Sequence, residues 1–86
     1  MKMFFTYILS SEKTGMFYVG SAHDIDERLA RHNNGRSRFT KGKGPWKVIY
    51  SEQFEMREDA IKREFEIKSW KSRKAIEKLI IRGPVV

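Results

Sequence analysis

The sequence predicts an α+β domain in which a three-stranded, mainly antiparallel sheet is flanked by about three helices, in the order ββαβαα. Two aromatic and β-branched stretches, residues 4–9 and 16–20, are separated by polar residues that end in Gly15, which is typical of a hairpin. A third strand-like stretch spans residues 46–54. Helical patterns occupy three further segments, 24–33, 58–70 and 72–81, and the first and last of these carry capping signals.

The composition limits the class of protein and of site. A chain of 86 residues predicts a single domain, residues 1–86. The absence of cysteine excludes disulfides and thiolate metal sites, and favours a cytoplasmic location. No stretch is long and apolar enough to span a membrane, so we expect no membrane partner. With only two histidines, a metal ion would bind carboxylate oxygen and water, which favours Mg²⁺ or Mn²⁺.

The positive charge is concentrated in one segment. The formal net charge is +7, and residues 28–51 contain seven basic residues and no acidic one. This pattern indicates that a nucleic acid binds one face of the molecule, although solvated charge that aids solubility is an alternative. The candidate contact residues all lie in this segment: Arg31, Arg36, Arg38, Thr40, Lys41, Lys43 and Lys47.

The predicted hairpin brings two tyrosines together. If its turn centres on Glu12-Lys13, Tyr7 and Tyr18 lie opposite each other on one sheet face. Either tyrosine alone would be explained by sheet packing. Gly20 ends the second strand, where the backbone must turn or let another group approach closely, and we expect a structural turn there.

The helix at 24–33 adds a guanidinium and an imidazole to this region. Asp24 and Glu27 have the spacing of a capping box, which fixes where the helix begins. Arg28 and His32 are four residues apart and therefore share one helix face. The hairpin and the helix thus direct a phenol, a guanidinium and an imidazole toward one region.

Residues 36–45, the basic loop, contain glycines and one aromatic residue, which suits contacts with phosphates. The loop lacks the G-x-x-x-x-G-K-[ST] pattern, which excludes a nucleotide P-loop. Phe39 either anchors the loop in the core, which we expect, or stacks on a base.

The third strand and the last helix complete the sheet and its cover. The third strand is expected to place three residues on one face: Trp46, Val48 and Tyr50. Ser72 can cap the last helix and Gly83-Pro84 can stop it, while Trp70 is expected to pack the second helix onto the third. The last helix is basic, which either extends a nucleic-acid footprint or forms a solvated face.

The second helix carries a carboxylate within its apolar arc. The expected buried arc consists of Ala60, Ile61, Phe65 and Ile67. Glu64 falls inside it, and a buried carboxylate must pair, take a proton or hold a metal ion. The structural alternative to a metal site is a half-exposed salt bridge to Lys68 or Arg28.

Taken in order, these motifs resemble the GIY-YIG nuclease family, in particular its small single-domain members and the nuclease domains of the excision-repair nuclease subunit and of homing endonucleases. The matching pieces are Tyr18-Val19-Gly20, the pair Arg28 and His32, and Tyr7, which is preceded by Phe5-Thr6 in place of the family's Gly-Ile. Glu64 matches the family's metal-binding glutamate. The larger members' additional asparagine has no counterpart near the end of this chain.

The resemblance implies the same fold and a metal-dependent endonuclease that hydrolyses DNA in repair or processing, with weak sequence specificity. Branched, flapped or damaged DNA is the implied substrate, and a protein partner could supply targeting. The implied catalytic residues are Tyr7, Tyr18, Arg28, His32 and Glu64, with one Mg²⁺ or Mn²⁺ on Glu64. A tyrosine would accept the proton of water with His32 or Lys41 as its partner. Two alternatives stay open: a non-catalytic nucleic-acid-binding module, and a small accessory subunit of a repair or replication assembly.

Overall fold

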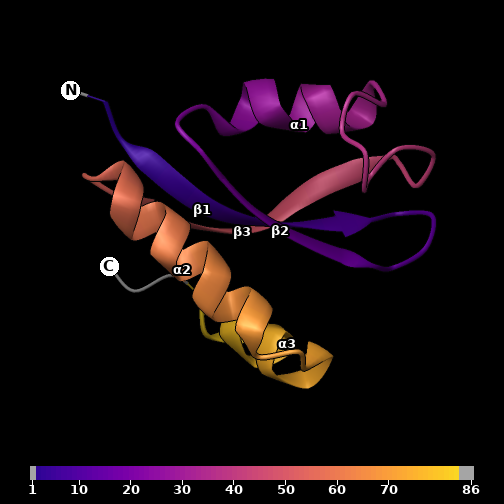
Figure 1. The fold of residues 1–86 in the computed structure, drawn as a ribbon. Helices are drawn as coiled ribbons and strands as arrows, with labels where there is room; N and C mark the ends of the chain where they lie inside the picture. Colours follow the sequence, from indigo (N-terminus) through magenta and orange to yellow (C-terminus); the bar gives the residue numbers. More distant parts are fainter. Residues whose placement is uncertain (1, 84–86) are drawn as a thin grey trace.

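The computed structural model describes residues 2–83 and confirms the predicted ββαβαα order (Figure 1). Its elements are β1 (Phe4–Ser11), β2 (Phe17–Ala22), α1 (Ile25–Asn33), β3 (Trp46–Phe54), α2 (Arg57–Ser69) and α3 (Arg73–Arg82). The strands form one antiparallel sheet in the order β2-β1-β3. Helix α1 covers one face of this sheet, whereas α2 and α3 lie on the other (Figure 1). Within residues 2–83, no helix has the length and apolar character needed to cross a lipid bilayer.

The hairpin register differs by two residues from the predicted one. Tyr7 pairs with Gly20 rather than with Tyr18. The reason is the turn, in which the Ser11 hydroxyl accepts hydrogen bonds from the backbone N–H groups two and three residues later, and Gly15 adopts a positive φ of 75°. A shift of two residues keeps side chains on the same face. The two phenol rings are therefore still neighbours, with 6.5 Å between the centroids of Tyr7 and Tyr18.

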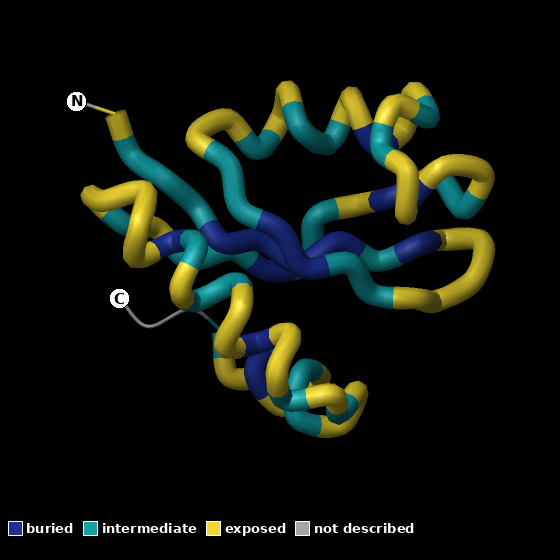
Figure 2. Tube along the Cα trace, viewed as in Figure 1, coloured by how far each residue is buried: buried dark blue, intermediate teal, exposed yellow. Residues whose placement is uncertain are grey.

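The middle of the sheet is buried, as the dark blue segments of Figure 2 show, and both of its faces carry buried side chains. On the α1 face, the buried cluster consists of Tyr7, Leu9 and Trp46. On the opposite face, the buried cluster consists of Ile8, Val19, Tyr50, Ile67 and Leu79. Trp70 packs half-buried against this second cluster, as expected for the junction of α2 and α3.

The prediction that Tyr50 shares a face with Trp46 and Val48 is wrong. Ile8 pairs with Tyr50, but the next residue of β1 pairs with Val48, so β3 carries one extra residue at this point. Such a bulge reverses the alternation of side chains along the strand. Trp46 and Val48 consequently face α1, and Tyr50 faces α2 and α3.

Helix α2 begins and ends one residue earlier than predicted, and its buried face is narrower. Ala60 and Ile67 are buried, but Phe65 is 62% exposed, so its assignment to the core is wrong. Ala60 and Ile67 are seven residues apart and lie on one line along the helix, while Phe65 points away from that line.

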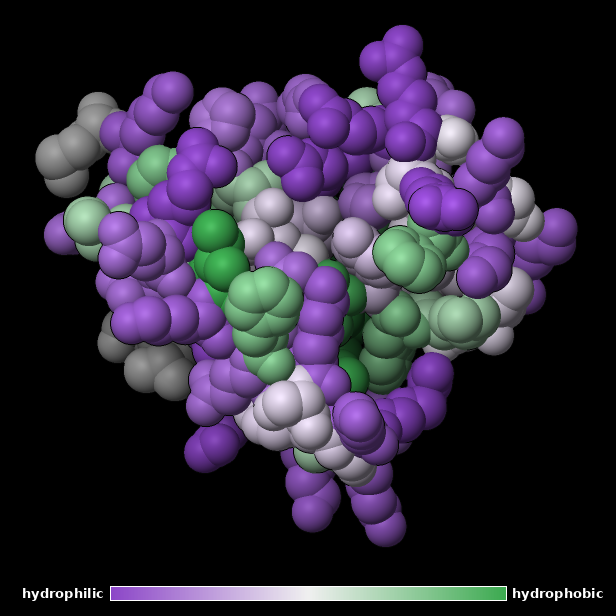
Figure 3. Space-filling view, viewed as in Figure 1, coloured by the Kyte–Doolittle hydropathy of each residue, from purple (hydrophilic) through white to green (hydrophobic). Residues whose placement is uncertain are grey.

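On the face seen in Figure 3, hydrophobic side chains gather near the middle and hydrophilic ones surround them.

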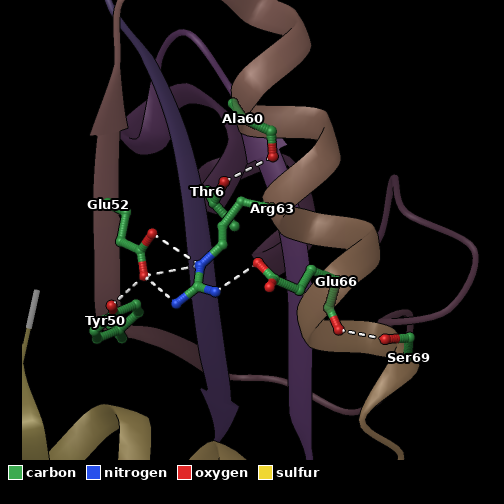
Figure 4. Close-up of polar contacts among 7 residues, drawn as sticks. All are labelled: Thr6, Tyr50, Glu52, Ala60, Arg63, Glu66 and Ser69. Atoms are coloured by element: carbon green, nitrogen blue, oxygen red, sulfur yellow. Dashed lines mark hydrogen bonds and ion pairs between the residues drawn. The ribbon is translucent and has the colours of Figure 1, made fainter.

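Polar contacts fix α2 to the sheet (Figure 4). The hydroxyl of Thr6 on β1 donates to the carbonyl of Ala60 at 2.7 Å. Arg63 donates from Nε and Nη2 to the carboxylate of Glu52 on β3, each at 3.0 Å, and this pairing raises the pKa of Arg63 above its ordinary value. Tyr50 donates to the same carboxylate, and burial together with this bond raises the pKa of Tyr50 to about 12. Helix α2 is thus held on two strands.

The ends of α3 confirm the predicted capping signals. The Ser72 side chain accepts a hydrogen bond from the backbone N–H of Ala75 at 3.1 Å. Gly83 follows the helix with a positive φ of 79°. Pro84, the other part of the predicted stop, lies outside the described residues.

Candidate active site

The candidate catalytic side chains meet at the free edge of β2. The strand order β2-β1-β3 leaves one edge of β2 without a partner strand in the described part of the chain. Helix α1 lies on one face of the sheet and α2 on the other (Figure 1), and Arg28 of α1 and Glu64 of α2 both contact Ser21 of β2. The site therefore lies where two helices on opposite faces approach the same strand edge.

Tyr7 reaches this edge across Gly20. Tyr7 belongs to the central strand β1, and a Cβ atom added to Gly20 would lie 2.5 Å from the Tyr7 Oη atom and 2.7 Å from Cζ. Gly20 lies inside β2, so the expected structural turn at this residue is wrong. The glycine instead permits the close approach of a neighbouring group, which is the phenol of Tyr7.

A chain of hydrogen bonds runs from Tyr7 through His32 to the basic loop. Tyr7 Oη lies 3.1 Å from His32 Nε2, and His32 Nδ1 lies 2.8 Å from Thr40 Oγ1. The single proton of the Thr40 hydroxyl is directed to the carbonyl of Ser37 at 3.5 Å. We therefore assign the proton of His32 to Nδ1, which leaves Nε2 to accept the hydrogen bond that Tyr7 donates.

The expected contact of Thr40 with nucleic acid is wrong for its side chain. Thr40 is only 1% exposed, and its hydroxyl is engaged with His32. Its carbonyl accepts from the Trp46 indole N–H at 3.1 Å, which adds a second buried anchor. Thr40 orients the imidazole and fixes the basic loop to the sheet.

Burial and neighbouring charges set the protonation states of Tyr7 and His32. Burial, with Arg28 and Arg31 as further causes, holds the pKa of His32 below its ordinary value, so the imidazole is neutral at pH 7. Burial, followed by the neighbouring Tyr18, raises the pKa of Tyr7 above its usual range. Tyr7 is therefore protonated at neutral pH and requires His32 as a proton acceptor if it is to act as a base.

Arg28 lies near Tyr7, with part of its guanidinium unpaired. Its Nη1 atom donates to the backbone carbonyl of Ser21 at 3.4 Å, and its Nε atom lies 3.8 Å from a carboxylate oxygen of Glu27. Among the described residues, the buried Nε atom has no hydrogen-bond partner. A free buried donor of this kind can bind an anionic oxygen of a ligand.

The capping box at the start of α1 is only half formed. Asp24 accepts from the backbone N–H of Glu27 at 3.0 Å, as predicted. The Glu27 side chain instead accepts from Arg31 at 2.6 Å. Arg31, a predicted nucleic-acid contact, is therefore paired within its own helix.

Glu64 is paired from two sides. Its Oε1 atom accepts from the hydroxyl of Ser21 at 2.7 Å, and its Oε2 atom lies 2.6 Å from Lys68 Nζ. The Glu64 side chain is 15% exposed and that of Lys68 is 43% exposed. The Lys68 ammonium also lies 5.8 Å from the centre of the Tyr18 ring, which places Glu64 next to the tyrosines. The expected salt-bridge partner of Glu64 is thus Lys68, not Arg28.

The donor set around Glu64 fits a magnesium-type ion but not an all-protein cage. Residues 2–83 contain no cluster of three or more His, Cys, Asp or Glu side chains that could enclose an ion. Mg²⁺ keeps several waters and commonly uses one or two carboxylates together with substrate phosphates. Glu64, supported by the hydroxyl of Ser21, satisfies that requirement, with Lys68 as a competing cation.

The basic loop extends from the His32 side of the site. Arg36, Arg38 and Lys41 in the loop are exposed, as is Lys47 on β3, while Lys43 is half-buried. Phe39 is 73% exposed, so the expectation that it anchors the loop in the core is wrong. The anchor is the following residue, Thr40.

The sequence did not predict three polar residues near the site: Ser21, His23 and Arg57. Ser21 supports Glu64, and a small pocket of about 50 Å³ beside Ser21 and Arg28 is also lined by His23 and Arg57. Because side chains alternate along a strand, Ser21 points to the opposite sheet face from Gly20. No local pattern in the sequence links Ser21 to α2. Likewise, His23 and Arg57 line one pocket only after folding.

Comparisons with known proteins identify a family and relatives. The family model described as the GIY-YIG catalytic domain matches residues 3–78. A UPF0213 protein of Staphylococcus saprophyticus is 39% identical over 84 residues, which cover 96% of this chain and 100% of that protein. A UPF0213 protein of Staphylococcus aureus is 35% identical over 77 residues, which cover 88% of this chain and 93% of that protein.

A solved structure has the same fold. The solution NMR structure of a UPF0213 protein from Bacillus halodurans matches with a TM-score of 0.57 and 32% sequence identity. The match covers 91% of this chain and 82% of the other. The three-stranded antiparallel sheet with its helices is therefore shared with a relative whose structure was determined independently.

Proposed function

Because the chain belongs to the GIY-YIG nuclease family, we propose that it is an endonuclease that hydrolyses phosphodiester bonds in DNA with one Mg²⁺ or Mn²⁺ ion at Glu64. The observation that carries this proposal is the buried hydrogen bond between Tyr7 Oη and His32 Nε2 at the edge of β2. A phenol paired with a neutral imidazole is a means of removing a proton from water at neutral pH.

The proton path follows from the assigned tautomer. As a water oxygen attacks phosphorus, its proton passes to Tyr7 Oη while the phenolic proton passes to His32 Nε2. The imidazole becomes an imidazolium whose Nδ1–H remains bonded to Thr40. Burial raises the pKa of Tyr7, so the phenol is protonated at neutral pH and gives its own proton to His32 when it accepts one from water.

Two groups would neutralise negative charge on the phosphate: Arg28 and a divalent ion held by Glu64. Arg28, with its unpaired buried Nε donor, binds a non-bridging oxygen and stabilises the additional charge of the transition state. When bound at Glu64, a divalent ion supplies further neutralisation of the phosphoryl group and of the departing oxygen. Tyr18 packs against His32, with 4.7 Å between ring centroids.

The wider role is proposed from charge and size. The exposed cations of the basic loop and Lys47 bind the DNA backbone without reading its sequence. Weak sequence specificity suits a role in DNA repair or processing, with residues 1–86 acting as one domain and a partner protein supplying targeting. The absence of cysteine supports a cytoplasmic location.

The test is nicking of supercoiled, branched and flapped DNA with Mg²⁺ or Mn²⁺ and with chelator. The wild type is expected to cut only with metal. Tyr7→Phe is expected to reduce the rate by about 10²–10⁴-fold, because the relay loses its first acceptor. Arg28→Ala is expected to reduce it by roughly 10²–10³-fold while weakening DNA binding only mildly.

Glu64→Gln is the matched control for the metal site, because glutamine keeps the size and removes the charge. It should abolish cleavage and also the gain in melting temperature that metal gives to the wild type. A folded wild type that binds DNA but cuts none of the substrates with either metal would overturn the proposal. That outcome would favour the non-catalytic binding module.

A further inference from the structure

Phe39 projects a hydrophobic ring into solvent from the basic loop. It is 73% exposed, although burying a phenylalanine side chain commonly stabilises a fold. The next residue, Thr40, is 1% exposed. The chain therefore buries a threonine and leaves the adjacent aromatic ring outside, a pattern that packing alone does not explain.

The ring is held on a rigid support rather than on a loose loop. Backbone hydrogen bonds from the N–H groups of Thr40 and Lys41 to the carbonyl of Ser37, at 3.3 and 3.0 Å, close a tight turn around Phe39. The turn is fixed to the sheet by the Thr40 carbonyl bonded to Trp46, and to the catalytic pair by the Thr40 hydroxyl bonded to His32. Phe39 thus stands one residue from the hydrogen-bond partner of the catalytic imidazole.

The charges around Phe39 suit a nucleic-acid strand. Arg38 and Lys41 flank it, both are exposed, and residues 28–51 contain no acidic side chain. Proteins that bind single strands combine cations that follow the backbone with aromatic rings on which bases stack. A paired base inside a duplex presents its edges but not its face, so stacking on Phe39 requires an unpaired base.

We infer that Phe39 is a stacking platform for an unpaired base of a DNA strand bound along the basic loop, and that the ligand class is DNA with unpaired nucleotides. This inference rests on the proposed function, because it takes the basic loop as part of the DNA-binding face. It names the feature of DNA that the enzyme recognises, which is an exposed base face rather than a sequence.

The test measures binding in chelator, so that cleavage does not contribute. Fluorescence anisotropy compares a labelled single-stranded oligonucleotide with its duplex, for the wild type and Phe39→Ala. Phe39→Ala is expected to weaken single-strand binding by roughly 5- to 100-fold, in line with the contribution of one stacked base, and to change duplex binding by less than about 2-fold. Phe39→Trp is expected to retain single-strand affinity, since an aromatic face is kept.

Ile81→Ala is the matched control, because Ile81 is 85% exposed and lies on α3, across the sheet from α1 and its loop. It should leave both affinities unchanged. A 2-aminopurine base in the single strand should change its emission on binding the wild type and not on binding Phe39→Ala. Equal reductions for single strand and duplex, or no reduction, would overturn the stacking role. Because no cleavage is measured, these outcomes are independent of whether the nuclease proposal holds.

Discussion

The phenol of Tyr7 crosses β2 at Gly20, the one position of that strand without a side chain, and so brings a residue of the central strand to the sheet edge. The distance of 2.5 Å between the Tyr7 hydroxyl and an added Cβ is below any ordinary contact. Gly20 is therefore a condition for the position of Tyr7 and for its bond to His32.

Gly20→Ala should displace Tyr7 and abolish its hydrogen bond with His32. We expect a decrease of about 1–3 kcal/mol in the free energy of unfolding, as for other overpacked sites, together with loss of cleavage. The measurement is a double-mutant cycle with Tyr7→Leu, because leucine does not reach across the strand. Gly20→Ala should cost much less stability in the Tyr7→Leu background; equal costs would contradict the steric explanation.

Lys68 should compete with a metal ion for Glu64, since its ammonium lies 2.6 Å from Oε2. Half-exposed pairs of this kind contribute at most about 1 kcal/mol, so Lys68→Met should tighten Mg²⁺ or Mn²⁺ binding by roughly 2- to 5-fold. The metal-dependent rise in melting temperature, measured without DNA, gives the affinity.

Lys62→Met is the charge-matched control on the same helix, because Lys62 is exposed and lies about 160° around the helix from Glu64. It should leave metal binding near that of the wild type. If the two lysine variants respond alike, the effect is one of net charge, and the Lys68–Glu64 pair does not regulate metal access.

His32 should make stability depend on pH in a defined direction. Its folded pKa is lowered, so above the unfolded value of about 6.5 the imidazole is neutral in both states and its contribution is fully present. As pH falls through about 6.5 toward the lowered pKa, the unfolded chain takes up a proton that the native state resists, and stability is lost. Melting temperatures between neutral and mildly acidic pH measure this loss.

The second histidine provides the control for that experiment. His23 is exposed, and His23→Gln should keep the pH dependence of the wild type. His32→Gln should flatten it. An unchanged slope in His32→Gln would assign the pH dependence to other groups, such as the carboxylates.

Salt dependence should locate the DNA footprint on the basic loop. The variant that tests this replaces four cations by alanine: Arg36, Arg38, Lys41 and Lys43. The slope of log affinity against log salt should flatten by about 0.7–0.9 for each DNA phosphate that the variant no longer neutralises. A charge-matched variant of the last helix and the turn before it replaces Lys71, Lys74, Lys78 and Arg82. If only this second variant flattens the slope, the footprint lies on α3.

Local signals in the sequence were sufficient for the order of the elements and for some of their ends, whereas β1 and β2 each end two residues later than predicted. Ser72 and Asp24 cap the helices that they were predicted to cap, and β3 spans the predicted residues. Each of these signals acts within a few residues, because capping and strand propensity depend on neighbouring backbone groups. The family resemblance likewise followed from short motifs at fixed spacing.

The tertiary structure decided which faces and partners these elements have. One bulge in β3 moved Tyr50 to the opposite face, and the two-residue shift of the hairpin put Gly20 beneath Tyr7. Register is a pairing between distant segments, and a shift of one or two residues changes partners without changing local propensity. Burial is likewise decided by the tertiary structure, since only the fold shows that the Phe39 side chain is exposed to solvent.

What the sequence determined by itself is the fold class, the caps of α1 and α3, the basic segment and the set of candidate catalytic residues, because these depend on residue type and short spacing. What only the folded structure decided is their assembly: Ser21 against Glu64 across the sheet edge, and Thr40 behind His32. These contacts join residues far apart along the chain or across a loop, and their geometry exists only once the sheet register and the position of α2 are fixed.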